Sequence, residues 1–172
     1  TEYEASGIPF DQRTKIFWET LDICQSLWKG GPVSHKGEIF EFNDIWCHPI
    51  PPQGSDIPLL FGVKMTESNA QKIAKIGHGW IPIKTSRDFI SEGSEKLNNA
   101  FKEAGRDDKP RIRGQLPTCV DSNGVPSVDL TLKELEKSME AGLEEIEVFP
   151  INFAQSPDHL REVLELIGEL KK

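Results

Sequence analysis

Residues 57–63, IPLLFGV, form a continuous apolar run of strand length near the middle of the chain. A strand that is apolar at every position is typical of a parallel sheet that is covered on both faces. The run is followed by a helical pattern over residues 67–76 and then by a second strand pattern, GWIPI, over residues 79–83. This order predicts a strand-helix-strand unit with parallel strands.

The short helix between these two strands has recognisable ends. Thr66 stands where an N-cap residue is expected, and Gly77 follows the last helical position. From spacing alone, Gly62 and Thr66 are best explained as residues that do no more than cap this helix.

The same alternation continues to the end of the chain. It consists of a helix that ends at Gly105, a strand over residues 111–120, a helix opened by a Thr131–Glu134 capping box, a strand over residues 143–149 and a last helix that begins at Ser156-Pro157. The pattern predicts an α/β fold with four parallel strands, each followed by a helix. We expect the strands to form one sheet in sequential order.

The first third of the chain has a different pattern. Apolar residues at helical spacing predict an amphipathic helix over residues 11–28, and Gly30-Gly31-Pro32 ends it. The segment GEIFEFNDIWCHPIPP alternates around Asn43-Asp44, which predicts two short strands in a hairpin. Because 172 residues suit one core, we predict a single domain over residues 1–172.

The composition excludes several classes of function. With 28 acidic and 20 basic residues the net charge is -8, so a general attraction to nucleic acid or to anionic lipid is missing, although a small local anion site remains open. No apolar run approaches the ~18 residues of a membrane helix, and residues 1–10 have no signal-peptide pattern. We therefore expect a cytoplasmic protein that binds neither nucleic acid nor membrane.

The cysteines and histidines do not predict a metal site. Cys24, Cys47 and Cys119 are odd in number and lack CxxC spacing, so we expect reduced thiols. The histidines have no carboxylate or cysteine partner at ligand spacing, apart from the neighbours Cys47 and His48. Adjacent residues on a strand point to opposite faces, which makes that pair a poor chelate.

Several phrases together resemble the luciferase-like monooxygenases, which are flavin- or deazaflavin-dependent (β/α)8-barrel oxidoreductases. They are EYEASGIPFDQR, SLWKGGPVSHKGEIFEF, PIPPQGSDIPLLFG, KIGHGWIP, FKEAGRDDKP and MEAGLEEIEVFP. Their order and spacing follow the family over nearly the whole chain.

The resemblance implies that residues 57–62, 79–83, 111–120 and 143–149 are the fifth to eighth strands of such a barrel. The chain is then expected to be the C-terminal half of a TIM (β/α)8 barrel, beginning just after the fourth strand. In the family, the other half carries much of the pocket for the isoalloxazine ring and the substrate. Because a half barrel leaves two open sheet edges, we expect a homo-oligomer.

The resemblance also implies a cofactor site, since the family binds the phosphate of FMN or of the deazaflavin coenzyme F420 after the fifth and sixth strands. The corresponding residues are Gly62, Val63, Lys64 and Thr66, with Gly79, Trp80 and Ile81 as a second wall. With the resemblance added, phosphate binding at the first group is favoured over simple helix capping. Trp80 is equally well explained as a core residue.

The chain departs from the family pattern at two points. Gly62-Val63 stands where the family usually has two glycines, and His78-Gly79-Trp80 stands where it usually has Asp-Gly-Trp. A phosphate-binding and a structural role both remain open for His78. Arg111 and Arg113, on one side of a strand, are either rim charges or anion contacts.

The resemblance predicts an oxidoreductase of the monooxygenase type that uses reduced FMN or F420 on a small-molecule substrate. No catalytic acid or base is identified, because the family's candidates lie mainly in the other half. Two alternatives remain: a non-catalytic flavin- or phosphate-binding remnant, and a half-barrel module that self-associates through its sheet edges.

Overall fold

The computed structural model of the protein describes residues 2–84, 86–115, 117–154 and 156–169. It has two compact units, residues 1–57 and residues 58–172. Whether the two units act as the single domain expected over residues 1–172 stays a prediction.

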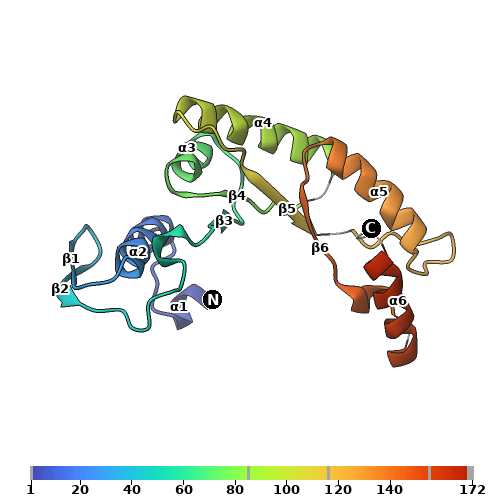
Figure 1. Ribbon diagram of the computed structural model, residues 1–172, viewed down its shortest axis with the longest axis horizontal. Helices are drawn as coiled ribbons and strands as arrows, with labels where there is room; N and C mark the ends of the chain where they lie inside the picture. The colour runs from blue at the N-terminus through green and yellow to red at the C-terminus, as the bar shows by residue number, and fades with distance from the viewer. Residues whose placement is uncertain (1, 85, 116, 155, 170–172) are drawn as a thin grey trace. The chain divides into compact units, whose positions relative to one another are not determined.

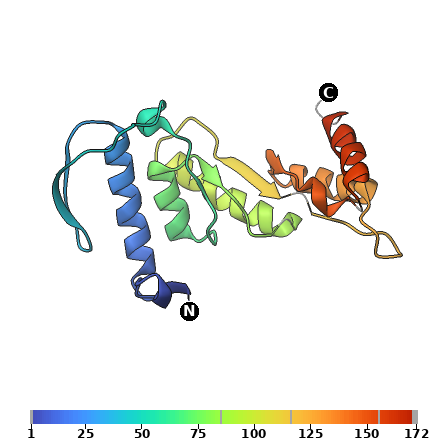
Figure 2. The ribbon, with the colours of Figure 1, turned by 90° about the horizontal axis from the view of Figure 1, so that it is seen from below.

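The first unit combines a long helix with a hairpin, as the sequence predicted. Figure 2 shows the hairpin running alongside α2. The elements are α1 (Glu2–Ala5), α2 (Arg13–Trp28), β1 (Val33–Lys36), β2 (Glu41–Ile45) and the 3-10 helix η1 (Gly54–Asp56).

The turn of the hairpin is not where the sequence placed it. The strands are joined at residues 37–40, where the Gly37 N–H donates to the Phe40 carbonyl at 2.9 Å, and Asn43 and Asp44 lie within β2. The prediction of a turn at Asn43-Asp44 is therefore wrong. A Cβ on Gly37 would lie 2.1 Å from Oε1 of Glu19, so a larger residue in this turn would displace the Glu19 carboxylate.

Glu19 joins the hairpin to α2. Its carboxylate accepts hydrogen bonds from the backbone N–H groups of Phe40 at 2.7 Å and of Ile39 at 3.1 and 3.2 Å, and Nε2 of His35 lies 3.1 Å away. Burial alone would raise the pKa of Glu19, but these hydrogen bonds outweigh it and lower the pKa.

The second unit contains four parallel strands in the order β3-β4-β5-β6, which confirms the predicted sheet. In Figure 1, α3 and α4 lie next to each other beside this sheet. The elements are β3 (Leu60–Phe61), α3 (Glu67–Ile76), β4 (Gly79–Trp80), α4 (Arg87–Glu103), β5 (Arg111–Gln115), α5 (Val128–Glu140), β6 (Glu145–Glu147), the 3-10 helix η2 (Pro150–Asn152) and α6 (Pro157–Glu169).

A layer of three paired residues forms the centre of this unit. Phe61, Trp80 and Ile112 are direct neighbours across β3, β4 and β5, so they share one face of the sheet. All three are buried, and Trp80 has no exposed surface. Its ring lies against Gly93 of α4, where a Cβ would come within 2.2 Å of it. This face is therefore the one that α4 covers.

The predicted helix cap of α5 and the predicted strand lengths of this unit are wrong. Thr131 does not open a capping box, because α5 begins at Val128 and Ser127 is its N-cap. Thr131 is instead buried within the helix, and its hydroxyl accepts a hydrogen bond from the Cys119 N–H at 3.0 Å. All four strands are shorter than the expected ranges, which were 57–62, 79–83, 111–120 and 143–149. Beyond β5 the chain reaches Pro117, which has no N–H to donate to a sheet.

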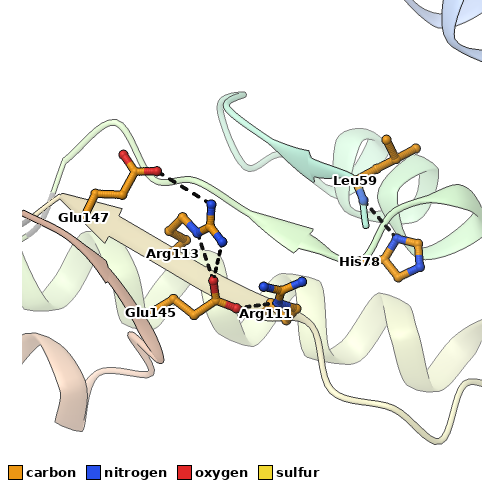
Figure 3. A network of polar contacts seen from close by, with 6 residues as sticks. All are labelled: Leu59, His78, Arg111, Arg113, Glu145 and Glu147. Carbon is orange, nitrogen blue, oxygen red and sulfur yellow. Dashed lines mark hydrogen bonds and ion pairs between the residues drawn. The ribbon is translucent and has the colours of Figure 1, made fainter. Parts of the chain in front are cut away.

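The opposite face of the sheet carries a network of ion pairs (Figure 3). Nε and Nη2 of Arg113 donate to Oε2 of Glu145 at 2.8 and 2.7 Å, and Nε of Arg111 donates to Oε1 of the same carboxylate. Nη1 of Arg113 lies 3.8 Å from Oε1 of Glu147. The hydrogen bond from Arg111, followed by that from Arg113, lowers the pKa of Glu145 below its ordinary value of 4.5.

We predict that Gly79→Ala destabilises the protein by about 2 kcal/mol or more, because a Cβ at this position would lie 2.0 Å from the Arg111 carbonyl oxygen in the neighbouring strand. The measurement is the free energy of unfolding in urea. Gly62→Ala is the control, since a Cβ on Gly62 meets no atom within 4 Å. Equal stability of the two variants would contradict the close approach of β4 and β5.

The Glu145 network predicts a pH dependence of stability. The pKa of Glu145 is lowered in the folded state, so its contribution is fully present above the ordinary value of 4.5 and is lost as the pH falls through the lowered value. Between about pH 5 and pH 3, we expect the urea midpoint of Glu145→Gln to fall less steeply with decreasing pH than that of the unsubstituted protein. Glu140→Gln is the control, since Glu140 pairs with Arg87 at 3.6 Å on the exposed surface. If the urea midpoint of Glu145→Gln falls with pH as steeply as that of the unsubstituted protein, the network does not stabilise the fold.

Candidate functional site

Residues 62–66, the loop that leaves the carboxyl end of β3 and enters α3, form the candidate site. In parallel α/β folds, this edge of the sheet is where loops and helix N-termini meet ligands. Thr66 is the N-cap of α3 as predicted, because its Oγ1 accepts the Asn69 N–H at 3.2 Å. The capping role is therefore confirmed. It leaves the hydroxyl hydrogen of Thr66 available for a second bond.

Two side chains hold the carbonyl groups of this loop. The indole Nε1–H of Trp80 donates to the Val63 carbonyl at 2.8 Å, and the Nδ2–H of Asn69 donates to the Lys64 carbonyl at 2.9 Å. In a trans peptide the C=O and the following N–H point in opposite directions. The N–H groups of Lys64 and Met65 are therefore directed away from these two side chains.

The backbone N–H groups of residues 63–66 donate to no acceptor within the part of the chain that the structure describes. Unpaired N–H groups at a helix N-terminus attract an anion, and each makes a short, charge-assisted hydrogen bond with it. Gly62 is exposed and its Cα faces open space, since a Cβ added there would meet no atom within 4 Å. The loop thus offers both the donors and the room that a phosphate group needs.

The charges around the loop are mixed. Lys64 lies beside the unpaired N–H groups, while Glu67, the first residue of α3, brings a negative charge to the same turn. The pKa of Glu92 on α4 is lowered, chiefly by its hydrogen bond to Lys96 and in smaller part by the charge of Lys64. Lys64 therefore already interacts with a carboxylate and would divide its attraction between Glu92 and a bound anion.

The three residues of the predicted second wall have structural roles in the sheet. Gly79 is required by the close approach of β5, Trp80 is fully buried, and the Ile81 N–H donates to the Phe61 carbonyl at 2.9 Å. Trp80 has no exposed surface, and its indole Nε1–H donates to the Val63 carbonyl, which fits the core role that the sequence also allowed. Contact between a cofactor and these three residues stays a prediction.

His78 has a structural role. It precedes β4, so it lies at the amino end of the strands, whereas residues 62–66 follow the carboxyl end of β3. Its Nδ1 accepts the Leu59 N–H at 3.1 Å (Figure 3), and its own backbone N–H donates to the Leu59 carbonyl at 2.8 Å. The sequence left phosphate binding and a structural role open for His78. The structure supports the structural role, since His78 joins the segment before β4 to the segment before β3.

Arg111 and Arg113, for which the sequence left rim charges or anion contacts open, are paired with a carboxylate in the structure. Both guanidinium groups pair with Glu145 on the face of the sheet opposite Trp80, so they act as partners in an ion-pair network. No local pattern signals this pairing, because Glu145 stands 32 residues after Arg113 along the chain.

Sequence reasoning missed Asn69 as a member of the site. An amide at the third helical position could have indicated it, since side chains at this position reach back to the residues before the helix. Within the described residues, no group of three histidine, cysteine or acidic side chains is placed to hold a metal ion. In the same part of the chain, no helix combines the length and the apolar character needed to cross a membrane.

Comparison with solved structures supports the fold. Monooxygenase RslO1 from Streptomyces bottropensis superposes with a TM-score of 0.62 at 18% identity, over 96% of this chain and 54% of that one. The coenzyme F420-dependent tetrahydromethanopterin reductase from Methanopyrus kandleri superposes with a TM-score of 0.66 at 15% identity, over 86% of this chain and 59% of that one. These likenesses agree with the predicted partial (β/α)8 barrel, and the chain spans little more than half the length of either protein.

Comparison with known sequences identifies the family. An uncharacterized protein of Mycobacterium tuberculosis is 36% identical over 107 residues, which are 62% of this chain and 37% of that protein. Residues 1–125 match the family model described as luciferase-like monooxygenase. The chain therefore belongs to the luciferase-like monooxygenase family.

Proposed function

We propose that this chain is part of a flavin- or F420-dependent oxidoreductase of the monooxygenase type, and that residues 62–66 bind the phosphate of its cofactor. Family membership supports the class of reaction. The observation that supports the site is the set of N–H groups of residues 63–66, which donate to no acceptor in the described part of the chain and follow the carboxyl end of a parallel strand.

The residues present fit a phosphate group. The N–H groups of Lys64 and Met65 would donate to its oxygens, and the Thr66 hydroxyl adds a further donor. The half positive charge of the α3 N-terminus favours an anion, and Lys64 reinforces it. Gly62 leaves the space beside the loop open. A short side chain at position 62 would fill that space without disturbing the free protein.

When bound, the reduced flavin or deazaflavin would supply the electrons of the redox reaction. The role of this chain is to hold the phosphate end of the cofactor and to fix its position, and the substrate is a small molecule. The Methanopyrus kandleri reductase depends on coenzyme F420, and the family resemblance implies either FMN or F420, so both cofactors are candidates for this chain. The described residues provide no acid or base that we assign to the reaction.

The proposal predicts that FMN binds to this chain through its phosphate. We expect fluorescence titration to show weak FMN binding, competition by inorganic phosphate and much weaker binding of riboflavin, which lacks the phosphate group. Gly62→Val should reduce FMN affinity by about tenfold or more, because its side chain would occupy the open space beside the donors.

Gly168→Val is the matched control for this experiment. A Cβ on Gly168 also meets no atom within 4 Å, and Gly168 lies in α6, outside the candidate site. It should leave FMN affinity unchanged. Equal binding of FMN and riboflavin, or equal affinity in Gly62→Val and the unsubstituted chain, would refute phosphate binding at this loop.

We further propose that the chain self-associates through its sheet edges. β3 and β6 are the outer strands of the sheet, and no strand within the described residues pairs with their outer sides. Unpaired strand edges favour association with another chain.

Self-association predicts that sedimentation velocity will show a mass above that of one chain, increasing with protein concentration. Leu60→Pro should reduce it, because proline at the β3 edge removes an N–H and restricts the backbone. A sharp boundary at the mass of one chain over a hundredfold concentration range would exclude association through these edges.

A further inference from the structure

The loop of residues 62–66 is oriented by residues that lie outside it. Its two central carbonyl groups accept hydrogen bonds from side chains of different elements, Trp80 of β4 and Asn69 of α3. Each bond fixes one peptide plane. Because the N–H of a trans peptide points opposite to its C=O, fixing the carbonyl also fixes the direction of the next N–H.

We propose that Trp80 and Asn69 are positioning residues of the anion site: Trp80 orients the Lys64 N–H, and Asn69 orients the Met65 N–H. The inference rests on the proposed function, because it assigns a role in phosphate binding to residues that do not touch the phosphate. Trp80 has no exposed surface and Asn69 is half-buried. Trp80 is thus held by packing, and Asn69 is held by its place in the first turn of α3, as a positioning role requires.

The packing around Trp80 makes its position rigid. The ring is enclosed by Gly93 of α4 and lies 5.7 Å, between centroids, from Phe89 of the same helix. The Nε1–H bond to Val63 spans 17 residues of sequence, so it links the loop to the core of the unit rather than to its own neighbours. The Val63 carbonyl is therefore held from the core side, and the Lys64 N–H points away from the indole.

Asn69 acts within the first turn of α3. Its backbone N–H donates to the Thr66 hydroxyl, while its side-chain Nδ2–H reaches the Lys64 carbonyl. One residue thus ties two members of the loop to the helix. A merely capping role needs only the first of these bonds, which involves the backbone and is independent of the side chain.

The test is an amide NMR titration of the full chain with inorganic phosphate. In the unsubstituted protein, the Lys64 and Met65 resonances should move together with one dissociation constant. Asn69→Leu keeps the size of the side chain but removes its donor. We expect it to weaken phosphate binding about two- to tenfold, with the Met65 response reduced and the Lys64 response retained.

The matched control is Asn98→Leu. The Nδ2–H of Asn98 donates to the Ser94 carbonyl at 2.8 Å within α4, so this substitution removes the same kind of hydrogen bond away from the loop. Phosphate binding should be unchanged. If Asn98→Leu weakens binding as much as Asn69→Leu, or if Asn69→Leu keeps the unsubstituted affinity and Met65 response, the positioning role is refuted while the phosphate site stands.

Trp80→Phe provides the complementary variant. It removes the Nε1–H while keeping an aromatic ring, and the expected result is loss of the Lys64 response with the Met65 response retained. Should this core variant fail to fold, the Asn69→Leu result decides the inference. If the unsubstituted chain shows no response to inorganic phosphate at Lys64 or Met65, both the proposed site and the positioning roles are wrong.

Discussion

The second unit depends on the fit between Trp80 and Gly93. A Cβ at position 93 would lie 2.2 Å from the indole, so α4 packs against β4 at a distance that only glycine permits. Trp80 is fully buried and is flanked in the sheet by Phe61 and Ile112. Burying a side chain of this size contributes about 2–3 kcal/mol. The same contact therefore stabilises the sheet and sets the position of the helix that covers it.

This core contact also connects the fold to the candidate site. The indole N–H of Trp80 donates to the Val63 carbonyl. A residue with no exposed surface therefore orients the backbone of a surface loop. The Thr66 hydroxyl oxygen accepts the Asn69 N–H and so caps α3, while its hydrogen can still donate to an anion. Helix capping and phosphate binding are compatible functions of the same residues, since both satisfy N–H groups at a helix N-terminus.

The two faces of the sheet differ in chemistry. The face toward α4 is apolar, whereas the face opposite carries two arginines and two glutamates, Arg111, Arg113, Glu145 and Glu147, whose charges balance. Any chain that covers this second face must keep these groups hydrogen-bonded, because an unpaired charge is costly in a low-dielectric interior. The open edges at β3 and β6 are therefore better candidates for association than the charged face itself.

The sequence by itself determined the order and type of the elements. The apolar run at residues 57–63 predicted the place of β3 but not its short length, and Thr66 and Gly77 predicted the bounds of α3 correctly. Helix ends depend on neighbours in the chain, which is why local sequence shows them. Only the tertiary structure decided which residues meet: that Trp80 holds Val63, that His78 joins β3 to β4 and that Arg113 pairs with Glu145. The same holds for Thr131, which sits in the buried face of a helix that Ser127 caps. Contacts between residues far apart in the chain depend on packing geometry, which local patterns of polarity do not encode.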